Sequence, residues 1–186
     1  MLTQAKQSIG QNDILDALSL ELKMLLDQLE FIENQILVLD NKIKIIVENW
    51  NTKITTIPGI GNTLAGVILG EIGDINRFAD KKKLVAFAGL DASVRESGES
   101  KSTRNHISKR GSIYLRTGFW QAAVAGLQHN QPFKEFYERK KKEGKCSQVA
   151  LGACARKLCE LVFSILKNNR EYDSEYLLKR NKENLS

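Results

Sequence analysis

Cysteine, histidine and long apolar runs are scarce in this chain of 186 residues, and each scarcity excludes a class of site. The three cysteines, Cys146, Cys154 and Cys159, are odd in number and lack a CxxC spacing, so they predict neither a disulfide framework nor a zinc site. They are typical of reduced thiols in a cytoplasm. The two histidines, His106 and His129, lack neighbours at metal-ligand spacing and are expected in surface or turn positions.

Membrane signals are lacking as well. No apolar run reaches the length that spans a bilayer, and the N-terminus has no signal-peptide pattern. We therefore expect a cytoplasmic protein with no membrane partner.

The charge is unevenly spread along the chain. The formal net charge is +6, but residues 1–50 hold four Lys/Arg and eight Asp/Glu, which gives −4 there and +10 in the remainder. A basic segment of this kind predicts an anionic partner for the second part of the chain, and DNA is the first candidate.

Residues 15–50 contain neither glycine nor proline and carry an unbroken heptad pattern. The apolar positions alternate three and four apart: Leu15, Leu18, Leu22, Leu25, Leu29, Ile32, Ile36, Leu39, Ile43, Ile46 and Trp50. This pattern predicts one long coiled-coil helix within residues 1–53, which pairs either with a copy of itself or with another helix. The acidic residues of this stretch are interpreted as solvent-facing charges rather than as a metal cluster: Asp13, Asp16, Asp27, Glu30, Glu33 and Asp40.

A glycine turn follows, Ile57-Pro58-Gly59-Ile60-Gly61, and leads into an amphipathic helix that begins near Asn62 and Thr63. The first N–H groups of a helix have no intrahelical partner, and together with the helix dipole they favour an anion. Residues 54–72 therefore resemble a helix-hairpin-helix, which grips the DNA backbone. A plain turn between two packed helices is the alternative.

The remaining periodic segments are helical, so the fold class is all-α or nearly so. A short helix opens at residues 80–83 and stops at Gly89, and three more helices run over about 112–128, 132–143 and 147–167 within a helical core at 112–168. We place the compact domain at 54–170. We expect the polar tail, 171–186, to fray.

Residues 90–111 are too polar for a core and predict an irregular β-hairpin, with arms around 93–96 and 106–108. Ser97 precedes Gly98 in this loop and is surrounded in sequence by cations. A serine hydroxyl beside cations could attack a phosphodiester, whereas a turn hydrogen bond is its ordinary role.

Seven sequence blocks, in order, resemble the C-terminal domain of the DEDD-type, bridge-RNA-guided insertion-sequence transposases, whose relatives include pilin-gene invertases. The blocks are residues 57–61, 89–90, 97–99, 107–111, 115–116, 122–123 and 155–158, and the match covers about residues 50–168. The heptad helix resembles the coiled coil that precedes this domain in the family.

The resemblance implies a role for Ser97 as the nucleophile that forms a phosphoserine link to DNA during strand exchange. It also implies a homo-oligomer joined by the coiled coil, a structured guide RNA, and Mg²⁺ held by a RuvC-like N-terminal domain. That domain has no counterpart in these 186 residues, so no cofactor is expected on this chain, and we expect the chain alone to bind DNA without cleaving it.

The residues predicted to contact DNA lie in the glycine turn and in the basic segments on either side of Ser97. They are Gly59, Ile60, Gly61, Asn62, Thr63, Lys81, Lys82, Lys83, Arg95, Lys101, Arg104, Lys109, Arg110 and Arg116. The triplet at residues 140–142 either contacts phosphates or is a solvated helix end. An oligomeric DNA-binding module without catalysis and a coiled-coil assembly protein without nucleic acid remain as alternative functions.

Overall fold

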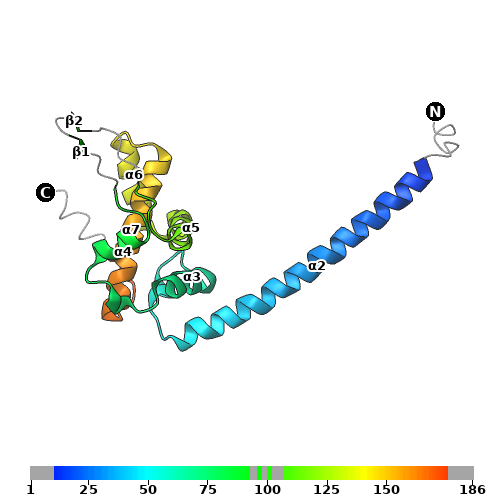
Figure 1. Ribbon diagram of the computed structural model, residues 1–186, viewed down its shortest axis with the longest axis horizontal. Helices are drawn as coiled ribbons and strands as arrows, with labels where there is room; N and C mark the ends of the chain where they lie inside the picture. Colours follow the sequence, from blue (N-terminus) through cyan, green and yellow to red (C-terminus); the bar gives the residue numbers. More distant parts are fainter. Residues whose placement is uncertain (1–10, 93–95, 98–99, 102–106, 176–186) are drawn as a thin grey trace. The chain divides into compact units, whose positions relative to one another are not determined.

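The computed structural model describes residues 11–92, 96–97, 100–101 and 107–175 (Figure 1). Within these ranges the chain is mainly helical, which confirms the all-α prediction. Its helices are α2 (Gln11–Asn49), α3 (Asn62–Ile72), α4 (Lys81–Phe87), α5 (Ile113–His129), α6 (Gln131–Lys142) and α7 (Ser147–Asn168). Two 3-10 turns, η1 (Ile54–Thr56) and η2 (Ile75–Arg77), and two very short strands, β1 (Glu96–Ser97) and β2 (Ser100–Lys101), complete the order.

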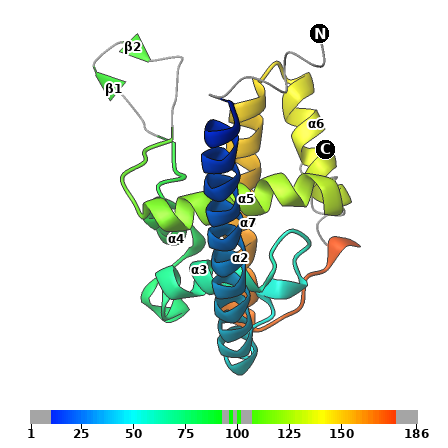
Figure 2. The ribbon, with the colours of Figure 1, turned by 90° about the vertical axis from the view of Figure 1, so that its right-hand side faces the viewer.

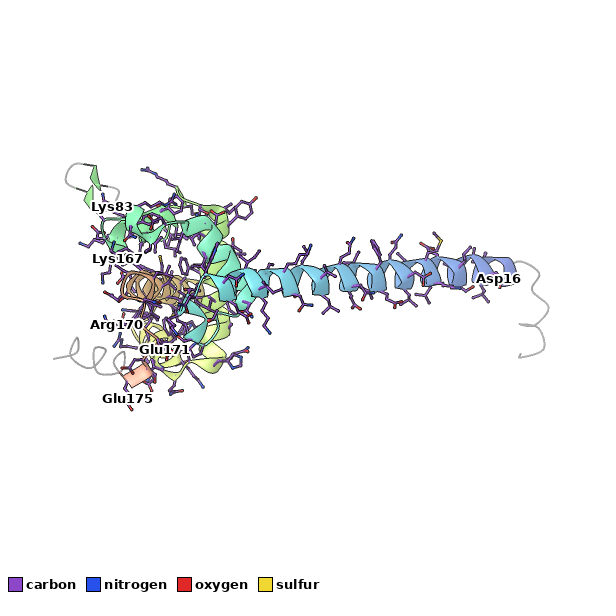
Figure 3. All side chains as sticks on the ribbon, turned by 90° about the horizontal axis from the view of Figure 1, so that it is seen from below. Asp16, Lys83, Lys167, Arg170, Glu171 and Glu175 are labelled. Atoms are coloured by element: carbon purple, nitrogen blue, oxygen red, sulfur yellow. The ribbon has the colours of Figure 1, made fainter. Side chains whose placement is uncertain are left out.

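The chain divides into two units, Met1–Lys42 and Ile43–Ser186. The first consists mostly of α2, whose 39 residues confirm the long helix expected from the heptads. The apolar heptad side chains of α2 are exposed to solvent: Leu22, Leu29 and Ile36 are each half exposed or more. Figure 3 shows side chains on all sides of α2, with Asp16 labelled near its beginning. Asp16, Asp27, Glu30, Glu33 and Asp40 are exposed, as predicted.

The last turns of α2 belong to the second unit, since the division falls between Lys42 and Ile43. Val47 is buried there. A Cβ added at Gly66 of α3 would stand 2.9 Å from Ile43 Cγ2, which shows how closely the two helices approach. The absence of a side chain at Gly66 lets the end of α2 pack on α3.

In the second unit, α5 lies at the centre of the core. It packs against α3, α6 and α7, and α4 packs on α7. Figure 2 shows α5 crossing α7. Phe119 of α5 and Cys154 and Cys159 of α7 are fully buried. Burial raises the pKa of the Cys154 thiol to about 11 and raises that of Cys159 further. All three cysteines are free, and only Cys146 of them is exposed.

The helix ends follow the predicted signals. The Asp80 carboxylate accepts from the amides of Lys82 and Lys83 at the start of α4, and the Ser112 hydroxyl accepts from Leu115 N at the start of α5. Gly89, just beyond α4, has a φ of +65°, the left-handed conformation that favours glycine. These caps explain why the helices begin and end close to the expected positions.

The prediction that the tail frays beyond Arg170 is wrong for its first residues. Tyr172 N donates to Thr56 Oγ1 at 2.9 Å, and the Tyr172 hydroxyl donates to Asn130 Oδ1 at 2.7 Å. Lys53 Nζ lies 3.3 Å from Glu171 Oε1. The segment after α7 is therefore tied to η1 and to the junction between α5 and α6. Arg170, Glu171 and Glu175 are labelled in Figure 3.

Candidate nucleic-acid interface

The glycine turn at residues 57–61 packs against α5. Gly59 has a φ of +100°, and a Cβ there would stand 2.7 Å from Gly126 N and 2.9 Å from Ala122 O. Ile60 is buried, and its amide donates to Ile57 O at 3.0 Å within the turn. The structure thus explains the glycine at position 59 by helix packing, while contact of Gly59 and Ile60 with DNA stays a prediction.

Gly61, Asn62 and Thr63 form the accessible end of the turn. Gly61 is the N-cap of α3, is exposed, and has open space where a Cβ would lie. Thr63 is exposed and Asn62 half-buried. No side chain caps this helix start, so its first N–H groups and dipole favour an anion. Contact of these three residues with DNA stays a prediction.

The basic triplet at the start of α4 is only partly available. Lys81 Nζ lies 2.8 Å from Glu160 Oε2 of α7, which holds α4 against α7. Lys82 and Lys83 are exposed, and Figure 3 labels Lys83 on the surface of the compact unit. Lys82 and Lys83 are therefore the members of the triplet that can reach a phosphate.

Within the predicted hairpin at residues 90–111, the described residues form two short stretches of antiparallel pairing. Glu96 pairs with Lys101 and Ser97 with Ser100 in an antiparallel ladder, while an isolated bridge joins Ala92 to Ile107 at the base. In both ribbon views β1 and β2 lie outside the helical body (Figures 1 and 2). The ladder places Ser97 opposite Ser100.

The base of the hairpin is tied to the end of α4 by backbone contacts. Ser112 N donates to Phe87 O at 2.7 Å, and Lys109 N donates to Gly89 O at 3.2 Å. The Ser108 hydroxyl also donates to the Asp91 carboxylate. Gly111 passes so close to Phe87 and Gly89 that a Cβ there would overlap the Phe87 carbonyl. These contacts fix the two ends of the hairpin on the helical body.

Three of the predicted cations lie at this base. Lys109 and Arg110 are exposed, and Lys109 adopts a left-handed backbone with a φ of +54°. Arg116 of α5 is half-buried, with Nη1 3.4 Å from Ala88 O. Nearby, the Ser112 hydroxyl donates to Glu71 Oε2 at 2.6 Å, which joins α3 to the start of α5.

Other predicted residues are described only in part or not at all. The structure describes the backbones of Ser97 in β1 and Lys101 in β2, but not their side chains. Arg95 and Arg104 lie entirely outside the described residues. The catalytic role of Ser97 and the DNA contacts of these cations stay predictions.

A cavity of about 780 Å³ opens beside the hairpin base. It is lined by Leu90, Ala92, Ile107 and Lys109 from the hairpin ends, by Arg116, Thr117 and Trp120 from α5, and by residues of α7 that include Gln148, Gly152 and Arg156. Lys109 and Arg116 are among the residues predicted from sequence to contact DNA, whereas Trp120, Gln148 and Arg156 are not. Trp120 has the spacing of a core residue, and the only signal for Arg156 is its place in a block matched to the family.

The basic end of α6 is largely engaged with its own surroundings. Lys140 Nζ lies 2.8 Å from Glu143 Oε2, and that contact lowers the pKa of the Glu143 carboxyl. Lys141 Nζ donates to Ser147 Oγ at 3.0 Å. Lys140 also lies over the ring of Phe136. These contacts favour a structural role for the triplet at 140–142.

No group of three or more His, Cys, Asp or Glu within the described ranges could hold a metal ion. The described residues therefore do not fit the Mg²⁺ site that the family resemblance implies.

In the same part of the chain, no helix is both long and apolar enough to cross a membrane.

Comparison with known proteins identifies similar sequences among mobile-element proteins. Residues 51–138 match the sequence profile described as Transposase IS116/IS110/IS902 family. The chain is 31% identical over 121 residues to the pilin gene-inverting protein of Moraxella bovis. The aligned region covers 64% of this chain and 38% of that protein.

Two further relatives have the same range of similarity. The transposase for insertion sequence element IS1111A of Coxiella burnetii is 30% identical over 123 residues, covering 64% of this chain and 34% of the relative. The insertion element IS116 44.8 kDa protein of Streptomyces clavuligerus is 28% identical over 146 residues, covering 74% of this chain and 36% of the relative. The chain thus spans about a third of the length of these curated relatives, and the predicted resemblance is confirmed at the level of the transposase domain.

Proposed function

We propose, from the premise that residues 51–138 are a transposase domain of the IS116/IS110/IS902 family, that this chain binds DNA and supplies Ser97 as the nucleophile of strand exchange. The observation that carries the proposal is the position of Ser97, on a hairpin whose base is held beside Lys109, Arg110 and Arg116. Cations at such a base stabilise the charge of a DNA backbone that passes the hairpin.

The reaction that fits a serine in this setting is transesterification. The Ser97 hydroxyl loses its proton, its oxygen bonds to a DNA phosphorus, and the bond from that phosphorus to one sugar oxygen breaks. The sugar oxygen leaves as a hydroxyl after taking up a proton. Attack by another sugar hydroxyl reverses the step and releases the serine. No bond is oxidised or reduced, and the cations offset charge on the phosphorus oxygens.

The proposal extends to partners that the family resemblance implies. The exposed heptad seam of α2 is suited to pairing with a second copy of this chain. A structured guide RNA would share the basic surface with DNA. The Mg²⁺ of the family would be held outside the residues described here, and no step above passes through it.

The test of DNA binding is the salt dependence of affinity for a duplex. Replacing Lys109, Arg110 or Arg116 singly with Gln should weaken binding and reduce the slope of log K against log salt by about one for each lost phosphate contact. Lys44→Gln removes one cation from α2 and serves as the matched control. If Lys44→Gln weakens binding as much as the other three, the assigned surface is wrong.

The test of catalysis is a covalent adduct between protein and DNA. Such an adduct should form in a complete transposase that contains this domain and should be lost in its Ser97→Ala variant. Ser100→Ala, a change of the same size on the paired strand, should retain it. An adduct that survives Ser97→Ala, with normal DNA binding, would favour the second candidate function, an oligomeric DNA-binding module.

A further inference from the structure

The cavity beside the hairpin base is not explained by a grip on the DNA backbone alone. Its volume of about 780 Å³ lies within the range of roughly 300–1,000 Å³ that is usual for small-molecule sites. It lies between α5, α7 and the ends of the hairpin that carries Ser97. A strand held at the hairpin base would therefore pass next to this cavity.

The charged groups of the cavity are all positive. Lys109, Arg116 and Arg156 line it, and the described lining includes no Asp or Glu. Arg156 Nε lies 3.6 Å from Glu160 Oε1, and the Arg156 side chain remains 45% exposed. Glu160 also holds Lys81 at 2.8 Å, so its charge is shared between two cations. The cavity therefore favours an anionic ligand such as a phosphate.

The remaining wall is apolar and aromatic. Trp120 lines the cavity together with two small residues of α7, Gly152 and Ala153. A Cβ added at Gly152 would lie 3.6 Å from Trp120 Cζ3, an ordinary contact distance, so this edge of the ring packs against α7 while Trp120 still lines the cavity. Gln148 supplies an amide at the same wall. An indole, an amide and cations together are suited to a nucleotide, whose base stacks on the ring and whose phosphate pairs with the cations.

We propose that this cavity holds one unstacked nucleotide of a DNA strand, with its base against Trp120 and its phosphate toward Lys109, Arg116 and Arg156. The proposal rests on the proposed function in that it presumes DNA on this face. It adds a site for a base, whereas the hairpin and its cations contact only the backbone. Holding one nucleotide out of the stack would bend the strand locally and expose its phosphodiester.

The experiment compares a dT oligomer with an equally long oligomer of abasic sugar-phosphate units. It uses the full chain with Trp50→Phe, which leaves Trp120 as the single tryptophan. The dT oligomer should bind about tenfold more tightly than the abasic one, in keeping with the contribution of base stacking, and should quench the emission of Trp120. The abasic oligomer should bind through its phosphates without quenching.

Two variants act on the cavity from different sides. Ala153→Leu fills it, and Val149→Glu places a carboxylate at a lining residue that is 51% exposed, where folding is not at risk. Each should remove the preference for dT and the quenching. The controls are Ala86→Leu on an exposed position of α4 and Val124→Glu on α5, where the valine is 45% exposed and lies outside the cavity.

The outcomes separate this proposal from the proposed function. Equal affinity for the two oligomers, or a preference that persists in both cavity variants, overturns the nucleotide site while leaving duplex binding intact. Failure of the unmodified chain to bind duplex DNA at any salt concentration overturns the proposed function itself. Binding of an apolar peptide in place of dT, with the same quenching, would show that the cavity serves a protein partner and would also overturn the proposal.

Discussion

Replacing Gly111 with Ala tests whether the base of the hairpin depends on a close backbone crossing. The added Cβ would overlap the Phe87 carbonyl and stand 2.7 Å from Gly89 N. Carbon atoms prefer separations of about 3.5–4.0 Å, so the two segments would have to move apart by about 1 Å or more. The obstacles are backbone atoms, which cannot rotate away as a side chain would.

The cost of this movement follows from the hydrogen bonds that it breaks. Ser112 N donates to Phe87 O at 2.7 Å and Lys109 N to Gly89 O at 3.2 Å, and neither bond survives such a shift. Each of these two bonds, broken so that its donor or acceptor is left without a partner, costs about 1–3 kcal/mol. We therefore expect Gly111→Ala to lower the free energy of unfolding by about 2–6 kcal/mol.

The assay is urea unfolding followed by the emission of Trp120, which lies in α5 of the compact unit, in the Trp50→Phe background. Gly70→Ala is the matched control, because Gly70 lies inside α3 with open space around a Cβ. Alanine in a helix interior is favoured over glycine, so this variant should be neutral or more stable by up to about 1 kcal/mol. A Gly111→Ala protein within about 0.5 kcal/mol of the unchanged protein would refute the reasoning.

Two further changes should alter stability. Burial raises the pKa of Cys154 to about 11, so the unfolded chain loses this proton at lower pH than the folded chain does. The free energy of unfolding should therefore fall as pH rises from about 9 toward 11. The fall is at most about 1.4 kcal/mol per pH unit for this thiol. Urea unfolding across that range should show a shallower fall in Cys154→Ala, and an unchanged fall contradicts the assignment. Tyr172→Phe should cost about 1–2 kcal/mol, since it leaves Asn130, which is 4% exposed, without the hydroxyl at Oδ1; an equally stable variant would show that the tail adds nothing.

Much of the fold could be predicted from local patterns. The heptads of α2, the Asp80 and Ser112 caps, and the glycines after α4 and α6 are each decided by residues close together in sequence. Such signals act through the backbone within one or two turns of helix, so they need no knowledge of the partner elements. The boundary within α2 could not be predicted this way, because it depends on the packing of Val47 and Gly66.

For the candidate site, too, some features follow from the sequence and others only from the tertiary structure. Sequence alone determined that the second part of the chain is basic, that a polar hairpin carries Ser97, and that the blocks follow the order of a transposase domain, because composition and motif order do not depend on folding. Only the tertiary structure decided that Gly59 serves packing on α5, that Lys81 is paired with Glu160, and that Trp120 and Arg156 share a cavity with Lys109. These residues are brought together by the crossing of α5, α7 and the hairpin base, and contacts between distant segments leave no periodic trace in the sequence.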